Sequence, residues 1–146
     1  MLGEVLGESS GTILGTRVLP SEGQQIKVEV SFQGKGHLLG EEIMDIGTYW
    51  QTIRPGGVLY GEGHVLMMTP QGEVADWIGF GVGRPTGPPP AASYAVSGSF
   101  QSASQKLSRL NSIVTAIEYE VDENSNYRYK LWEWLPARVE AFASEG

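Results

Sequence analysis

Two neighbouring stretches decide the fold, residues 58–68 (VLYGEGHVLMM) and residues 73–83 (EVADWIGFGVG). Both alternate apolar and polar residues, and their glycines follow the same period of two. Since successive side chains of a strand point to opposite faces, the glycines of each stretch share one face of their strand. Glycines repeated at this spacing let a sheet bend and coil strongly, as a small closed barrel requires. The intervening Thr69-Pro70-Gln71-Gly72 predicts the turn of a β-hairpin.

The same alternation extends over most of the chain. It is most regular over residues 25–33, where Ile26, Val28, Val30 and Phe32 share one face. Further strands are expected over residues 4–6, 12–19, 43–53 with a bend at Gly47, 92–102, 113–122 and 127–134.

One helical turn is expected over residues 104–111, and the tail after residue 136 is expected to be short. Ser104 is the expected N-cap of the turn, and Leu107 and Leu110 share one face of it. At residues 139–143 either a second helical turn or a frayed end is expected.

The order of the expected elements predicts the fold class. Eight or nine short strands follow one another through brief turns, and no strand–helix–strand unit interrupts them, so a parallel sheet is not expected. We therefore predict an all-β protein, an antiparallel up-and-down β-barrel of about eight strands with one short helical turn. The length of 146 residues predicts a single barrel domain over residues 1–146.

Composition narrows the classes of function. The chain has no cysteine, which excludes a disulfide framework, a thiolate metal site and a cysteine nucleophile. Its formal net charge of −7 and its scattered basic residues predict no nucleic-acid partner and no membrane partner. The first residues carry acids and no basic segment before an apolar stretch, and no apolar run is long enough to cross a bilayer. A cytoplasmic location is the expectation.

Several segments of the second half resemble a known family. They are residues 77–83 (WIGFGVG), 100–111 (FQSASQKLSRLN), 118–122 (EYEVD) and 131–134 (LWEW). They resemble uncharacterised small bacterial barrels related in fold to plant allene oxide cyclase and to dirigent proteins. The resemblance covers roughly residues 60–134. It implies an eight-stranded antiparallel barrel, often oligomeric, with a cavity inside. The plant cyclases rearrange a lipid epoxide largely by shaping it in an apolar pocket, but none of their functional residues can be placed on this sequence.

Three polar residues alternate on one expected strand and therefore share a face: Tyr60, Glu62 and His64. One interpretation is a polar cluster inside a pocket, with Glu62 as an acid or base or His64 as a polarising group. The other is a solvated face, with the intervening glycines packing closely on the opposite side. No metal site is expected, because Glu62, His64 and His37 lack the tight spacing of a ligand set.

The remaining candidate site residues are Trp77, Glu118 and Glu133. Trp77 and the other aromatic side chains fit either the lining of a cavity or a solid core. Glu118 shares a face with Glu120, a pairing typical of a solvated surface. Glu133 fits either an inward-pointing acid or an exposed partner of a Lys or Arg.

No sequence motif identifies a reaction. Residues 79–83 lack the spacing of a dinucleotide fingerprint, and the chain contains neither a phosphate-binding loop nor a serine nucleophile elbow. No cofactor is expected, and the catalytic residues are unknown. The first hypothesis is the binding of a small apolar molecule in the barrel cavity, with contacts expected at Tyr60, Glu62, His64, Trp77, Glu118 and Glu133. The alternatives are a cyclase- or isomerase-type enzyme acting on an apolar substrate, and a structural homo-oligomer without a ligand.

Overall fold

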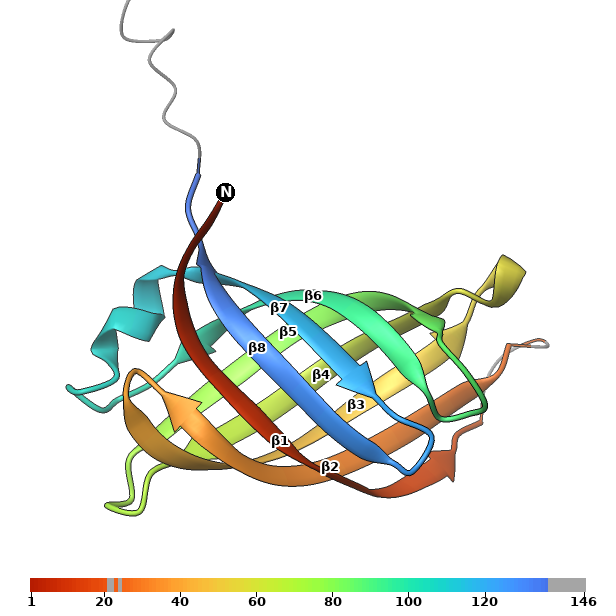
Figure 1. The fold of residues 1–146 in the computed structure, drawn as a ribbon, viewed down its shortest axis with the longest axis horizontal. Coiled ribbons are helices and arrows are strands. Elements are labelled where there is room, and N and C mark those ends of the chain that lie inside the picture. The colour runs from red at the N-terminus through yellow and green to blue at the C-terminus, as the bar shows by residue number, and fades with distance from the viewer. Residues whose placement is uncertain (21–22, 24, 137–146) are drawn as a thin grey trace, which may run out of the picture.

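A computed structural model describes residues 1–20, 23 and 25–136. It contains eight β-strands and two short 3₁₀-helices (Figure 1). In chain order the elements are β1 (Leu2–Val18), β2 (Lys27–Leu38), β3 (Glu41–Ile53), η1 (Pro55–Gly57), β4 (Leu59–Met68), β5 (Val74–Pro85), β6 (Ala92–Gln101), η2 (Ser108–Ser112), β7 (Val114–Val121) and β8 (Asn126–Trp134).

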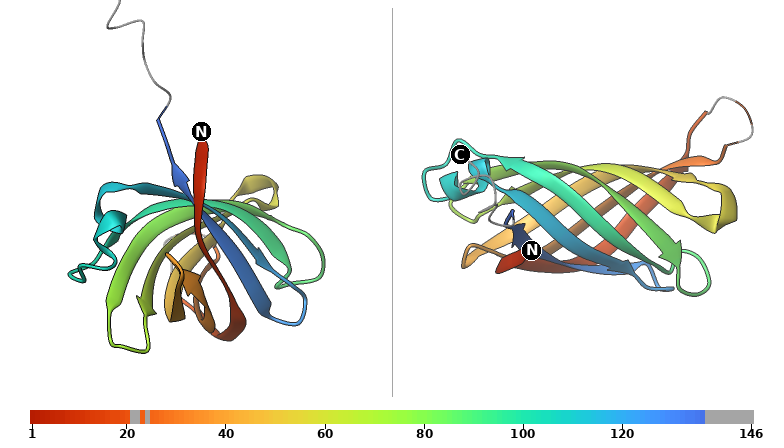
Figure 2. Two further views of the ribbon diagram at one scale, coloured as in Figure 1. Left: turned by 60° about the vertical axis from the view of Figure 1, so that its left-hand side comes forward. Right: turned by 90° about the horizontal axis from the view of Figure 1, so that it is seen from above.

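The strands form one closed barrel in which every strand pairs antiparallel with the next along the chain (Figure 2). The barrel closes between β1 and β8, where the register runs from Leu2 opposite Trp134 to Thr12 opposite Asn126. The predicted all-β, up-and-down antiparallel barrel is confirmed. Among the described residues, no helix has the length and apolar character needed to cross a membrane.

Two strands are longer than the sequence predicts. The two segments expected at residues 4–6 and 12–19 belong to the single strand β1, which contains a register shift between Ile13 and Gly15. β3 runs without a break through Gly47, where a bend was expected. The reason at Gly47 is packing, because the ring of Phe32 on β2 lies where a Cβ of residue 47 would be.

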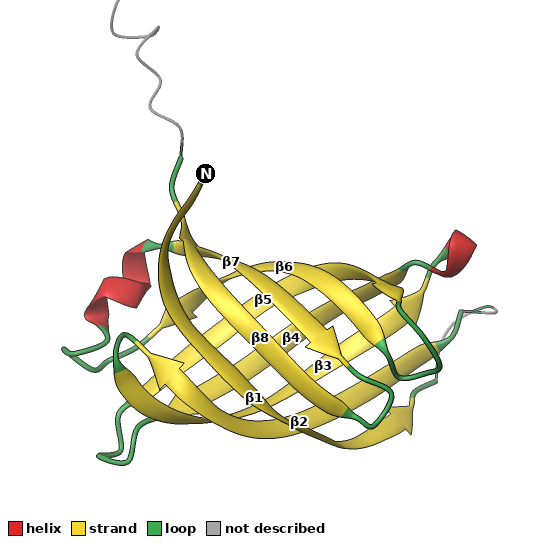
Figure 3. Cartoon of the chain, viewed as in Figure 1, coloured by secondary structure: helices red, strands yellow, loops and turns green. Residues whose placement is uncertain are grey.

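The helical turn lies slightly later than predicted. It is the 3₁₀-helix η2, seen with η1 in Figure 3, and the residue at its N-cap position is Leu107 rather than Ser104. The expectation that Leu107 and Leu110 share a buried face is confirmed, since their exposed fractions are 1% and 0%. The expected segment 139–143 lies outside the described residues.

The barrel has two unlike ends. At the η2 end the interior is filled with aliphatic side chains that are at most 4% exposed: Leu6, Leu38, Ile43, Met67, Leu107, Leu110 and Leu131. The opposite end carries η1 and the loop of residues 86–91. Between the two ends the interior, which we call the lumen, is mostly aromatic.

Candidate functional site in the barrel lumen

Tyrosine dominates the lumen. Of the six tyrosines in the chain, five turn inward and only Tyr60 turns outward. The inward tyrosines are Tyr49, Tyr94, Tyr119, Tyr127 and Tyr129. Together with the ring of Phe32 they form a network of ring pairs with centroid separations of 4.9–6.5 Å. Rings at these separations attract one another beyond the apolar surface that they bury.

Inward-facing glycines make room for the rings. The indole of Trp77 lies where the Cβ atoms of Gly79 and Gly98 would be, and the ring of Tyr94 lies where that of Gly83 would be. Trp77 is fixed in this position because its indole N–H donates to Thr115 Oγ1 at 3.0 Å. In the sequence these glycines predict bends in the sheet. In the structure they leave space that aromatic side chains occupy.

Gly61 is the exception, because no side chain occupies the position that its Cβ would take. A Cβ at Gly61 would have the Trp50 carbonyl oxygen at 3.4 Å and the Tyr49 ring at 3.8 Å as its nearest neighbours, an ordinary contact distance. Gly61 lies opposite Gly81, and Gly63 lies opposite Gly79, in the β4–β5 register. These four glycines form a wall without side chains, which we call the glycine wall.

A cavity of about 80 Å³ lies between the glycine wall and the aromatic rings. Its other sides are formed by the rings of Tyr49, Trp77, Tyr94, Tyr119 and Tyr129 and by aliphatic side chains that include Val65 and Ile117. The cavity exists because β4 and β5 contribute glycine where the facing strands contribute tyrosine.

The cavity surface is almost entirely apolar, and the hydroxyls of its tyrosines bond to one another or to neighbouring groups. The hydroxyls of Tyr49 and Tyr119 are 3.3 Å apart, and Tyr94 donates to Gln51 Oε1 at 2.6 Å. The second bond crosses the lumen from β6 to β3, which are not neighbours in the sheet. Burial raises the pKa values of Tyr49, Tyr94 and Tyr119, so these phenols stay neutral.

A buried carboxylate lies next to the cavity. Asp45 is 1% exposed and accepts hydrogen bonds from Ser9 Oγ at 2.6 Å, Tyr127 Oη at 2.7 Å and Tyr129 Oη at 3.0 Å. No sequence motif marks Asp45. The sequence shows only that Asp45 shares a strand face with Ile43 and Gly47, and the structure turns that face inward, where a charged side chain is unusual.

The six predicted site residues separate into three groups. Trp77 lines the cavity. Tyr60, Glu62 and His64 lie on the outer face of β4, where Tyr60 donates to Glu62 at 2.9 Å and His64 pairs with Asp76. Of the two interpretations of these three residues, the geometry matches the solvated face.

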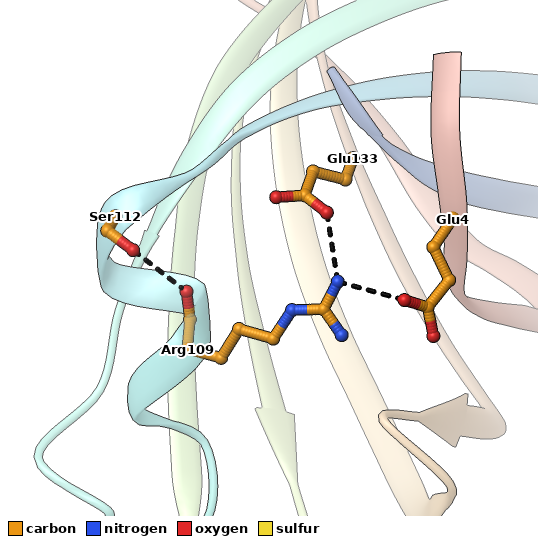
Figure 4. A network of polar contacts seen from close by, with 4 residues as sticks. All are labelled: Glu4, Arg109, Ser112 and Glu133. Atoms are coloured by element: carbon orange, nitrogen blue, oxygen red, sulfur yellow. Dashed lines mark hydrogen bonds and ion pairs between the residues drawn. The ribbon is translucent and has the colours of Figure 1, made fainter. Parts of the chain in front are cut away.

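The third group consists of two acids outside the cavity. Glu118 is exposed on the outer face of β7, opposite Lys130 of β8. Glu133 points to the η2 end, where Arg109 Nη2 donates to it at 2.9 Å and to Glu4 at 3.1 Å (Figure 4). Glu133 therefore matches the interpretation as an arginine partner. A binding role for either acid stays a prediction.

We expect the contacts of Arg109 to contribute little to stability. The side chain of Arg109 is 42% exposed, and exposed ion pairs contribute about 1 kcal/mol or less. Arg109→Gln should lower the free energy of unfolding by less than about 1 kcal/mol in urea titrations. A much larger loss would show that the ion pairs, rather than Leu107 and Leu110, hold η2 on the barrel.

Metal ligands do not come together in the described part of the chain. No group of three His, Cys, Asp or Glu side chains there is arranged to hold an ion. His37 lies on β2, whereas Glu62 and His64 lie on β4.

Comparisons with known proteins place the fold. No family model matches the chain, and no curated protein matches it. Solved structures do match. A protein with unknown function from Clostridium acetobutylicum has a TM-score of 0.77 and 13% identity, over 90% of this chain and 98% of that one. A beta-barrel like protein from Acinetobacter baumannii has a TM-score of 0.76 and 15% identity, over 91% of this chain and 94% of that one.

A third match is an enzyme from Penicillium herquei, with a TM-score of 0.62 and 18% identity, over 89% of this chain and 92% of that one. The bacterial matches confirm the resemblance to uncharacterised small bacterial barrels at the level of the fold. The likeness to allene oxide cyclase and dirigent proteins stays a prediction.

Proposed function

We propose that the barrel binds a small, mainly apolar molecule in the lumen cavity. The observation that carries the proposal is the uncovered glycine wall at Gly61, which faces the tyrosines across an unfilled space. Close-packed cores rarely leave such a space, and apolar cavities of this kind take up apolar guests. Burial of the guest's apolar surface against the rings is the driving force.

The cavity volume limits the guest. At about 80 Å³ it is roughly half the size of the ~150 Å³ apolar cavity known to bind benzene. A single five- or six-membered ring is therefore the upper limit, and it enters only when the lining side chains shift to enlarge the cavity. The phenol oxygens of the lining tyrosines accept a hydrogen bond from one polar group on that ring.

The test combines a small panel of guests with a variant that fills the cavity. Benzene, phenol and cyclopentanol are titrated by calorimetry and by shifts in the thermal unfolding midpoint. Gly61→Leu places its side chain in the cavity and should abolish binding while the barrel stays folded, because a Cβ fits at this position. Val82→Leu adds apolar volume on the outer face of β5, where Val82 is 42% exposed, and should leave binding unchanged.

Two results would contradict the proposal. One is that no guest in the panel binds at millimolar concentration. The other is that Gly61→Leu binds the guests as the natural chain does.

A second candidate function is a cyclase- or isomerase-type reaction in the same cavity. It is favoured by the match to a solved enzyme over 89% of the chain. An enzyme would convert a bound guest, and nuclear magnetic resonance would then show a product spectrum that changes with time. An unchanged guest spectrum for every bound compound would argue against it.

A homo-oligomer in the cytoplasm is also proposed. It is supported by apolar side chains on the outer faces of β3, β4 and β5 that are 39–62% exposed: Met44, Ile46, Leu66, Ile78, Phe80 and Val82. Exposed apolar patches mark interaction surfaces in many proteins. Sedimentation of a monomer at all concentrations would rule the oligomer out.

A further inference from the structure

Asp45 is unusual because its formal charge is buried without a cation beside it. Among the described residues it is the sole buried side chain with a formal charge. Its three hydrogen-bond donors are the neutral hydroxyls of Ser9, Tyr127 and Tyr129. A buried carboxylate without an opposite charge is costly, and neutral donors offset only part of that cost.

Asp45 is coupled to the cavity through two residues that line it. Met67 lies directly opposite Asp45 in the β3–β4 register, and Tyr129 donates its hydroxyl hydrogen to Asp45. Since that hydrogen is already used, the oxygen of Tyr129 is left to accept a hydrogen bond. Donation of the hydrogen to a carboxylate strengthens the oxygen as an acceptor.

Most of the other hydroxyl and indole hydrogens of the lumen are already used. Tyr94 donates to Gln51, Trp77 donates to Thr115, and Thr115 donates to the Gly98 carbonyl. Tyr49 and Tyr119 use one of their two hydroxyl hydrogens on each other. The cavity surface is almost entirely apolar, and the little polar surface that it has offers an acceptor rather than a donor, which suits an apolar guest that donates a hydrogen bond.

The aromatic lining and the overall charge favour the same kind of guest. The faces of tyrosine and tryptophan rings attract cations, most strongly where water is excluded. The formal net charge of −7 raises the local concentration of small cations around the protein.

We propose that the guest of the lumen cavity is a small protonated amine on an apolar ring, with its N–H groups directed to Tyr129 and its charge balanced by Asp45. This inference rests on the proposed function, since it names the class of guest for the same cavity. In this arrangement one ammonium N–H donates to Tyr129 Oη, Tyr129 donates to the Asp45 carboxylate, and the other N–H groups lie against the aromatic faces.

The experiment compares two probes of nearly the same shape, cyclopentylamine and cyclopentanol, by calorimetry at neutral pH. The amine should bind at least about tenfold more tightly, because the attraction of Asp45 acts only on the charged probe. Asp45→Asn should bring the two affinities together by weakening the amine alone. The matched control is Asp76→Asn on the outer face of β5, which removes the same charge from the chain and should leave the preference unchanged.

Tyr129→Phe provides an independent arm should Asp45→Asn fail to fold. It keeps the carboxylate and two of its donors but removes the acceptor that faces the cavity, so the preference for the amine should also fall. A preference that persists in either folded variant would overturn the inference.

The probes also separate this inference from the function on which it rests. If cyclopentanol binds as tightly as cyclopentylamine or more tightly, the inference that the guest is an amine is wrong. The proposal that the cavity binds a small apolar molecule is then still supported. If neither probe binds the natural chain, and the neutral panel also fails, both are overturned.

Discussion

The free energy of unfolding should fall steeply once the pH rises above about 10. Burial raises the pKa values of Tyr49, Tyr94, Tyr119, Tyr127 and Tyr129 above the ordinary value of 10.0. The folded barrel therefore keeps protons that the unfolded chain releases. The stabilisation is complete below the unfolded pKa and is lost as the pH rises towards the folded values, at about 1.4 kcal/mol per pH unit for each tyrosine. For five tyrosines the slope reaches about 7 kcal/mol per pH unit.

Urea titrations between about pH 8 and about pH 11 measure this slope, and ultraviolet absorbance of tyrosinate shows which rings ionise. Tyr60, whose pKa is raised by its hydrogen bond to Glu62, is the one tyrosine expected to ionise before unfolding. Tyr60→Phe should remove that early signal and leave most of the alkaline loss of stability in place, because the five buried tyrosines cause it. Reversible ionisation of several tyrosines in the folded protein would mean that water reaches the lumen, contrary to the packing described above.

Two alanine substitutions on the same inner surface should have opposite consequences. Gly98→Ala places a Cβ on the Ile78 carbonyl and on the Trp77 indole, and the indole is held in place by its bond to Thr115. We expect a loss of about 3 kcal/mol in the free energy of unfolding. Gly61→Ala meets only ordinary contacts, so it should be neutral or should add up to about 1 kcal/mol by restricting the unfolded chain.

Urea unfolding of the two variants side by side gives the comparison, and near-ultraviolet circular dichroism reports on the environment of Trp77. Equal losses for the two variants would mean that the general strand preferences of glycine and alanine decide the result. In that case the packing of aromatic rings against glycines would not explain why the lumen contains so many glycines.

The period of two was enough to predict the barrel, but it did not show which face of each strand turns inward. On β5 the outward residues Ile78, Phe80 and Val82 are larger and more apolar than the inward glycines between them. From the sequence of β5 alone, the face that carries Ile78, Phe80 and Val82 would wrongly be assigned to the core. The rings that cover the glycines come largely from other strands, so only the closed barrel resolves the choice.

Asp45 shows the same limit for the site. Its hydrogen-bond partners lie 36, 82 and 84 residues away along the chain, on β1 and β8. They come together only because β8 pairs with β1 to complete the barrel. No local spacing records this arrangement. Trp77 was a candidate because of its aromatic side chain, but Phe80 on the same strand is aromatic too and is 51% exposed, so aromatic bulk alone does not select the inward residue.

The hydrogen bond from Tyr94 to Gln51 has a kinetic consequence. It joins opposite sides of the barrel between the cavity and the η1 end, while leucines occupy the η2 end. For the guest that we propose, exit past η1 requires this 2.6 Å bond to open. We expect its residence time to be set by the opening rate of the barrel, so that two guests of unequal affinity share one escape rate.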